Sequence, residues 1–288
     1  MDHHDHDHSL AQDIQTMLDM TLSRRQALRW MFASAAALPL SGCGGGGDSG
    51  GSTLSTTPAA AGTGTTPATG SSGSCAVIPE ETGGPYPGDG TNSSVGGVAN
   101  ALILAGIVRP DIRASIAGAT GVAAGVPLTI KLQMVNVKSS CASLAGATVY
   151  LWHCDREGRY SMYTSGVTAE NYLRGVQEAD ASGMVTFTTI FPGCYAGRMP
   201  HVHFEVYPSL AKSTSAANRI KTSQFGFPTS MLSDAYAATG YSASVRNLAN
   251  ITYATDNVFS DGTALQIASV SASASLGYVA TLTVGVSL

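Results

Sequence analysis

The chain has 288 residues, a length typical of one or two domains, and its apolar content of 44% is ordinary for a globular protein. Charged residues make up only 12% of the chain, and the formal net charge is −4. Because no basic run occurs outside Arg24 and Arg25, composition and charge exclude an ordinary nucleic-acid-binding surface, and we expect no nucleic-acid partner.

Residues 1–43 have the features of a bacterial export signal. Arg24 and Arg25 form a twin-arginine signature, and the apolar run that follows, 30–40, is too short to span a bilayer. The tetrapeptide Leu-Ser-Gly-Cys that ends at Cys43 resembles a lipoprotein box, in which this cysteine becomes the lipidated first residue. Ordinary cleavage without lipidation is the alternative. We expect export by the twin-arginine route to the periplasm or outer surface, with membrane contact only through a lipid anchor at Cys43.

Residues 44–74 consist almost entirely of Gly, Ser, Thr, Ala and Pro. Such a segment cannot bury enough apolar area to order itself. We predict a flexible tether with a root-mean-square reach on the order of 30 Å. The folded domain is therefore expected over residues 75–288.

Four cysteines remain in this domain, and an exported protein can pair them as two disulfides in three ways. Cys154 and Cys194 both lie close in sequence to candidate metal ligands, which favours Cys154–Cys194 together with Cys75–Cys141. The alternative is four free thiols, with a softer metal bound at Cys154 or Cys194.

Strand patterns dominate the domain. Over residues 128–135, apolar side chains alternate with Thr, Lys and Gln, which is typical of a strand with one buried face. Helical periodicity is weak, and a short helix is expected only over 229–238. The protein is therefore predicted to be mainly β, as an antiparallel β-sandwich with few short helices. Further strands are expected over 147–151, 183–191, 202–207 and 278–286.

His201 and His203 are the most informative residues of the domain. On an extended strand they project from the same face, about 7 Å apart at the backbone, and can bind one metal ion. Cupins and zinc hydrolases also use such pairs, but no histidine follows the pair and only His153 precedes it in the domain. An all-imidazole site is therefore hard to complete. Phenolates would have to complete it, with Tyr195 a candidate, and hard oxygen donors suit Fe(III).

Four motifs then follow one another in a specific order. They are Thr-Gly-Gly-Pro-Tyr at 82–86, Trp-His-Cys-Asp with Gly-Arg-Tyr-Ser at 152–161, Tyr-Leu-Arg-Gly-Val-Gln at 172–177, and Gly-Cys-Tyr…Arg…His-Val-His at 193–203. In these motifs the chain resembles the intradiol ring-cleavage dioxygenases, the family of protocatechuate 3,4-dioxygenase and catechol 1,2-dioxygenase. The resemblance covers most of residues 75–260.

The resemblance implies one non-haem Fe(III) ion per chain, held by Tyr160, Tyr195, His201 and His203. It also implies that the ring of a catechol-type diol is opened between its two hydroxylated carbons with O2, giving a muconate-type diacid. In this reaction Tyr195 would take a proton from the substrate, Arg198 would stabilise negative charge on it, and Gln224 would orient that arginine. Tyr160 would stay bound throughout.

Two further residues are expected near the substrate on the same grounds, Tyr86 and Trp152, although packing alone is the alternative for each. His153 is expected to be structural. The chain departs from the family pattern at Cys194. It also lacks the helical N-terminal dimerisation segment of the catechol-specific branch, and the oligomeric state stays open.

Two other function classes remain as alternatives. The first is a surface lipoprotein that binds catechol-type ligands or iron without turnover. The second is a surface β-sandwich without a ligand, which leaves the four motifs unexplained.

Overall fold

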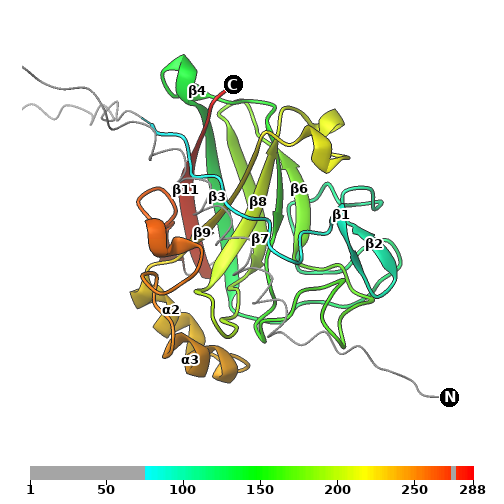
Figure 1. Cartoon of the computed structure of the whole chain (residues 1–288), viewed down its shortest axis with the longest axis vertical. Helices are drawn as coiled ribbons and strands as arrows, with labels where there is room; N and C mark the ends of the chain where they lie inside the picture. Colours follow the sequence, from blue (N-terminus) through cyan, green and yellow to red (C-terminus); the bar gives the residue numbers. More distant parts are fainter. Residues whose placement is uncertain (1–74, 274–276) are drawn as a thin grey trace, which may run out of the picture. The chain divides into compact units, whose positions relative to one another are not determined.

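The computed structural model describes residues 75–273 and 277–288, so the predicted signal (1–43) and tether (44–74) lie outside the described residues. Within the described part, two sheets face each other (Figure 1). One contains β3 (Pro127–Asn136), β4 (Ala142–Ser143), β7 (Met184–Ile190), β10 (Ser269–Ser273) and β11 (Gly277–Val286). The other has the order β6 (Arg174–Glu178), β5 (Thr148–Trp152), β8 (His201–Tyr207), β9 (Lys221–Gly226).

The main apolar core lies between these two sheets. The alternation predicted over 128–135 is observed, since Leu128, Ile130 and Leu132 of β3 are 0–1% exposed. From the other sheet, Val202 and Phe204 of β8 enter the same cluster. Burial of these side chains from water is the main force that holds the sheets together. The mainly β sandwich fold is therefore confirmed.

The outer face of the second sheet is also buried, and this matters for function. All seven residues of β8 are buried, because a second apolar cluster covers the face opposite the core. Ala101, Leu102 and Ile107 contribute to this cover from the segment that follows the hairpin of β1 (Asp89–Ser94) and β2 (Gly97–Asn100). Side chains of β8 that would face solvent in an ordinary sandwich are therefore enclosed.

The pairing is not antiparallel throughout, which corrects the prediction. β11 pairs in parallel with β3 over the register from Tyr278–Leu128 to Val286–Asn136. A parallel pair needs a long connection, and here nearly the whole domain lies between the two strands. β10 then pairs antiparallel with β11.

The helices close one end of the sandwich. The predicted helix over 229–238 is observed as α2 (Thr229–Tyr236), and it buries Leu232, Ala235 and Tyr236. A second helix, α3 (Ser242–Leu248), was not predicted; it is only seven residues long and buries just Ser244. Beyond it, the orange segment of Figure 1 returns to β9, where Gly226 bridges to Ile267.

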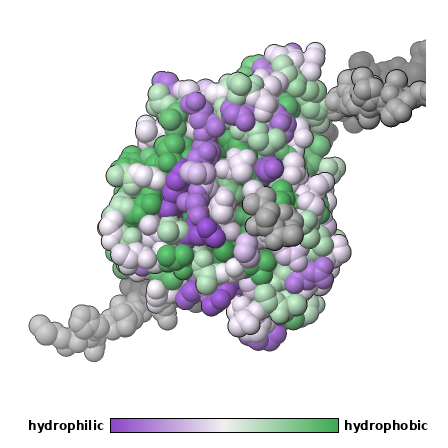
Figure 2. Space-filling model, turned by 180° about the vertical axis from the view of Figure 1, so that it is seen from behind, coloured by the Kyte–Doolittle hydropathy of each residue, from purple (hydrophilic) through white to green (hydrophobic). Residues whose placement is uncertain are grey.

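Short 3₁₀ turns complete the described elements: η1 (Val137–Ser139), η2 (Leu210–Lys212), η3 (Ala216–Asn218) and η4 (Phe259–Asp261). Figure 2 shows the face behind that of Figure 1, where apolar areas are broken up by a band of hydrophilic residues. In the part of the chain that the structure describes, no helix combines the length and apolar character that a bilayer crossing requires.

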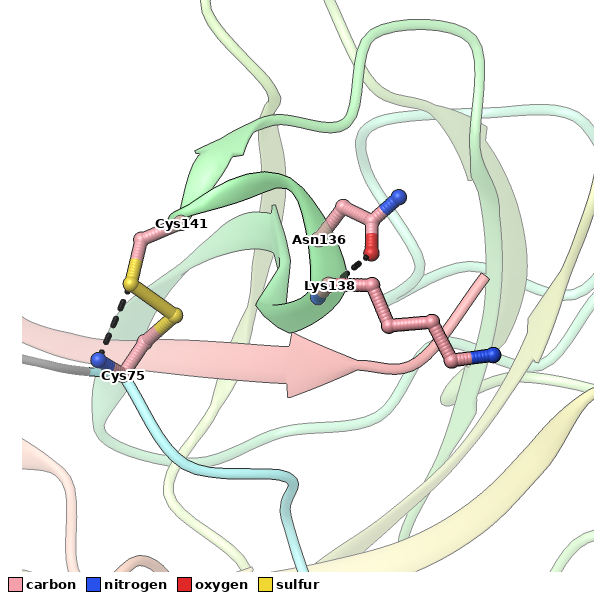
Figure 3. Close-up of a disulfide and its surroundings, with 4 residues drawn as sticks. All are labelled: Cys75, Asn136, Lys138 and Cys141. Atoms are coloured by element: carbon pink, nitrogen blue, oxygen red, sulfur yellow. Dashed lines mark hydrogen bonds between the residues drawn. A yellow bond between two sulfur atoms is a disulfide. The ribbon is translucent and has the colours of Figure 1, made fainter.

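One of the two expected disulfides is present. Cys75 and Cys141 are bonded, which fastens the start of the domain beside η1, as Figure 3 shows. The backbone nitrogen of Cys75 also donates to Cys141 Sγ at 2.9 Å, and Asn136 caps η1 by accepting from Lys138 N.

The expected Cys154–Cys194 bond was wrong, because both cysteines are free and buried. Their side chains pack into different apolar clusters, Cys194 between the sheets and Cys154 on the outer face of the second sheet. Each thiol is instead directed at backbone, Cys154 at Gly193 O and Cys194 at Arg198 O, at 3.4 Å in both cases.

Reduction of Cys75–Cys141 should lower the stability of the domain. The bond joins residues 66 apart, and closing a loop of that length in the unfolded chain is worth up to about 4 kcal/mol. We expect the thermal unfolding midpoint to drop on adding a thiol reductant. A Cys75→Ser/Cys141→Ser variant should start at the lower midpoint and not respond to reductant. A response in that variant would show that another bond is responsible.

Candidate metal centre

Because side chains alternate along a strand, His201 and His203 lie on the same face of β8, as predicted. His201, His203 and Glu205 alternate with the core residues of β8 and lie on its outer, enclosed face. The neighbouring strands bring further side chains to this face, since Trp152 of β5 and Gln224 of β9 both pair in register with His203. Tyr160 and Tyr195 reach the same place from loops and belong to the cluster that covers it.

Four donor atoms converge on one point. His201 Nε2 lies 3.0 Å from His203 Nε2, 3.2 Å from the Tyr195 hydroxyl and 3.3 Å from the Tyr160 hydroxyl. The four side chains are at most 8% exposed. At metal–donor distances of about 2.0–2.2 Å, the neighbouring donors of one ion lie about 2.8–3.6 Å apart. The observed separations therefore fit a single metal ion.

The tautomer of His201 also fits metal binding. Its Nδ1 lies 2.6 Å from the carbonyl oxygen of Met199, and a carbonyl can only accept, so Nδ1 carries the hydrogen. In the neutral ring this leaves a free lone pair on Nε2, the atom that lies within 3.3 Å of the other three donor atoms. Fixing one ring nitrogen through a backbone carbonyl is how proteins commonly orient a metal-ligating histidine.

Trp152 supports the other histidine from behind. Its ring stacks on that of His203 with centroids 4.9 Å apart and an angle of 4° between the planes, and on Tyr150 at 5.0 Å. The indole is fully buried. The structure thus places Trp152 as the packing partner of a candidate ligand, in agreement with the packing alternative for this residue.

Burial keeps these groups neutral. It raises the pKa of Tyr160 well above its usual range and that of Tyr195 to about 12, and it lowers the pKa values of His201 and His203 well below theirs. Desolvation penalises every charged form in such a place. Two phenols and two imidazoles are thus held as uncharged donors, and a cation bound between them would favour ionisation of the phenols.

Arg198 is the charged group of the site, and it is 2% exposed. Its Nη1 lies 3.4 Å from His201 Nε2, and its Nη2 donates to Gln224 Oε1 at 2.7 Å, as expected for an arginine oriented by that glutamine. Gln224 is itself fixed, because its Nε2 donates to Thr82 O at 2.7 Å. Burial alone would lower the pKa of Arg198, but Tyr195 and Asp256 outweigh it and the pKa is raised.

Sequence reasoning missed Asp256. Its fully buried carboxylate accepts from Arg198 Nε at 3.0 and 3.2 Å. The two residues are 58 positions apart and belong to no shared motif, so no local pattern marks the pair. The only available signal was indirect, since a buried guanidinium needs a carboxylate partner.

The donor set distinguishes this site from other metal centres. In residues 75–273 and 277–288, no group of three or more His, Cys, Asp or Glu side chains is placed to hold a metal. The cluster around His201 Nε2 instead combines two imidazoles with two phenols. The thiols of Cys154 and Cys194 contact backbone carbonyls, which gives no support to the softer-metal alternative.

Comparison with known proteins agrees with this reading. A family model described as "Dioxygenase" matches residues 111–214, the part that holds Tyr160, Tyr195, Arg198, His201 and His203. The fold is similar to that of an intradiol ring-cleavage dioxygenase from Tetranychus urticae, at 25% identity and a TM-score of 0.55, over 74% of this chain and 95% of that chain. The chain is similar to the intradiol ring-cleavage dioxygenases in its motifs, in the matched family model and in its fold.

A second similar structure is that of the dioxygenase Tetur07g02040, at 22% identity and a TM-score of 0.55, again over 74% of this chain and 95% of that one. The resemblance in the four motifs is therefore confirmed, and the chain is an enzyme of the oxidoreductase class. Asp256 and Gln224 both lie beyond the matched residues 111–214.

The remaining candidate residues lie on either side of the donor cluster. Tyr86 is half-buried, and its ring packs on Tyr160 at 4.9 Å and on Tyr163 at 5.2 Å, beside a candidate ligand. His153 lies apart from the cluster. Its Nδ1 contacts Cys154 O and its Nε2 contacts Thr189 Oγ1, both at 2.7 Å, which agrees with a structural role.

A glycine sets the position of Tyr195. Gly158 has φ +83°, and a Cβ added there would lie 2.9 Å from Tyr195 Cβ. Gly146 has φ +81° but nothing within 4 Å. Alanine at either position should cost about 1–2 kcal/mol of backbone strain. Only Gly158→Ala should also displace Tyr195, and we expect its activity to fall about 10–100-fold. Equal activity in the two purified variants would contradict this.

Glu205, next to the histidines on β8, should make stability depend on pH. It is 1% exposed, and burial raises its pKa from 4.5 to about 8. The folded state then holds a proton that the unfolded state has lost, so stability declines as the pH rises from about 4.5 to 8. Glu205→Gln should flatten this decline, as measured by urea unfolding at pH 5 and pH 8. The exposed Glu178→Gln should leave it unchanged. An unaltered decline in Glu205→Gln would refute the assignment.

Proposed function

We propose that this enzyme binds one non-haem Fe(III) ion and opens the ring of a catechol-type diol between its two hydroxylated carbons, placing both atoms of O2 in a muconate-type diacid. The observation that carries the proposal is the convergence of two phenols and two imidazoles at 3.0–3.3 Å around His201 Nε2. Tyr160, Tyr195, His201 and His203 would hold the ion. When bound, Fe(III) would supply a Lewis acid for the two diol oxygens.

The residues around the ion have separate tasks. Binding a diol through both oxygens requires that two protons leave. Tyr195 Oη, ionised in the loaded site, would accept one of them, and hydroxide from solvent would take the other. Arg198 presents its Nη1 edge to the cluster and stabilises negative charge that develops on the bound ring. Tyr160, further enclosed at 2% exposure against 8% for Tyr195, is the ligand that stays in place.

The enclosure of the site serves the same chemistry. All four donor residues and Arg198 are buried, so water is kept from the site and electrostatic interactions are stronger than at a surface. Trp152 holds the plane of His203, and Met199 O holds that of His201. Donors fixed in this way need little reorganisation during the reaction.

A purified, iron-loaded preparation tests the proposal. It should be red-brown from phenolate-to-iron charge transfer and should consume one O2 per catechol, with a product whose mass equals the sum of the two. A panel of catechol, protocatechuate, hydroxyquinol and substituted catechols would define the substrate. Colourless protein with stoichiometric zinc after growth with ample iron would overturn the proposal. Tight catechol binding without O2 uptake would favour the binding lipoprotein instead.

We propose further that the enzyme acts outside the cytoplasm. The twin arginines, the lipoprotein box and the Gly/Ser-rich segment 44–74 support this placement. Acyl chains on Cys43 would hold the domain at a membrane surface, and the twin-arginine route carries folded proteins. Arg24→Lys/Arg25→Lys should leave active enzyme in the cytoplasm, and Cys43→Ser should abolish membrane retention. Finding the unaltered protein in the cytosol with residues 1–43 intact would contradict this placement.

A further inference from the structure

The carboxylate of Asp256 binds Arg198 from outside the cluster of four donor atoms. It lies in the turn between α3 and η4 and is completely buried. Oδ1 accepts from Val258 N at 2.8 Å and Phe259 N at 3.1 Å, and Oδ2 accepts from Met199 N at 2.7 Å. Together with Arg198 Nε on both oxygens, these bonds use the full accepting capacity of a carboxylate.

These contacts divide the guanidinium of Arg198 into two edges. Nε faces Asp256, while Nη1 and Nη2 face His201 and Gln224. The side chain thus has partners on two sides, and its reactive edge is directed at the cluster of donors. Gln224 fixes one end of that edge, and Asp256 fixes the opposite corner of the planar group.

The same carboxylate also acts on the backbone next to the ligands. Met199 N donates to Asp256 Oδ2, and Met199 O accepts from His201 Nδ1 at 2.6 Å. One residue thus connects the carboxylate to the ring of a candidate ligand. Asp256 is therefore linked both to the guanidinium of Arg198 and, through Met199, to the orientation of the His201 ring.

We propose that Asp256, in the segment between α3 and η4, is a positioning residue of this enzyme. It acts through Arg198, whose guanidinium it holds in place. The inference rests on the proposed ring cleavage, because that reaction gives Arg198 its task. If the inference is correct, the residues that catalysis depends on extend beyond the segment that carries the candidate iron ligands.

A double-mutant cycle with full-length, iron-loaded protein tests the inference. Asp256→Asn keeps the shape of the side chain and removes its charge. We expect kcat to fall on the order of 100-fold with a much smaller change in KM, because substrate still binds while Arg198 is misplaced. In the Arg198→Met background the same substitution should cost less than about 3-fold, because residues that act as one unit are not additive.

Asp89→Asn is the matched control. Asp89 is also a buried aspartate paired with an arginine, Arg219, but it lies outside the site. It should change kcat less than about 2-fold in either background, even where it lowers stability. A full additive loss from Asp256→Asn in the Arg198→Met background, or an unchanged kcat in Asp256→Asn alone, would overturn the inference.

A second measurement uses metal-free protein, so it does not depend on turnover. The Arg198 Nε hydrogen, identified by NMR through its loss in Arg198→Met, should exchange with solvent slowly in the wild type and at least about 10-fold faster in Asp256→Asn. Asp89→Asn should leave it unchanged. Equal exchange in all three would overturn the inference, even where ring cleavage is established.

Folding of the variants is itself informative. If Asp256→Asn alone does not fold, the double variant with Arg198→Met should, because it leaves no buried charge unpaired. Loss of folding in both would show that Asp256 is needed for the fold whether or not Arg198 is present, and would overturn the positioning role.

Discussion

Tyr160→Phe should remove much of the red-brown colour expected of the iron-loaded enzyme and weaken its affinity for iron by at least about 100-fold. The substitution removes one atom, the hydroxyl oxygen that lies 3.3 Å from His201 Nε2. The phenyl ring keeps its packing against Tyr86 and Tyr195, so the fold should survive. Iron content and the visible spectrum of the purified variant measure the effect directly, and ring cleavage should fall with them.

Tyr236→Phe provides the control for this prediction. Tyr236 is also a buried tyrosine, and its hydroxyl donates to Pro192 O at 2.9 Å, outside the donor cluster. It should lose a small amount of stability and keep colour and iron. If Tyr160→Phe retains full colour and stoichiometric iron, the assignment of Tyr160 as a ligand is wrong.

Arg198→Lys should lower kcat by about 100–1000-fold while leaving iron content unchanged. Lysine keeps the positive charge, but it has a single donor group that cannot reach Asp256, Gln224 and the cluster at once. The charge would then be buried without a fixed direction. Because Arg198 is not among the four candidate ligands, colour and metal stoichiometry should match those of the wild type, which separates this effect from loss of iron.

Arg219→Lys is the matched control, since Arg219 also pairs with a buried carboxylate, that of Asp89, but its side chain is 39% exposed. Solvent-exposed ion pairs contribute little, so activity should stay within about 2-fold of the wild type. Activity of Arg198→Lys near the wild-type level would show that only the charge of Arg198 matters and that its fixed geometry does not.

Much of the centre was predictable because strand geometry is local. A period of two places His201 and His203 on one face of any regular strand, and the structure has them on the same face of β8. The alternation over 128–135 likewise identified the buried face of β3. Tyr160 and Tyr195 were implied as a pair by the resemblance to the dioxygenase family in the four motifs, and the structure brings both hydroxyls within 3.3 Å of His201 Nε2.

The sequence by itself thus determined which faces are buried and which residues gather at the candidate centre. Only the tertiary structure decided how distant segments pair: the parallel contact of β11 with β3, the separation of Cys154 from Cys194, the stacking of Trp152 on His203, and the carboxylate of Asp256 behind Arg198. The physical reason is that periodicity belongs to a short stretch of backbone. The choice of a partner far along the chain depends instead on how loops close and buried charges are matched.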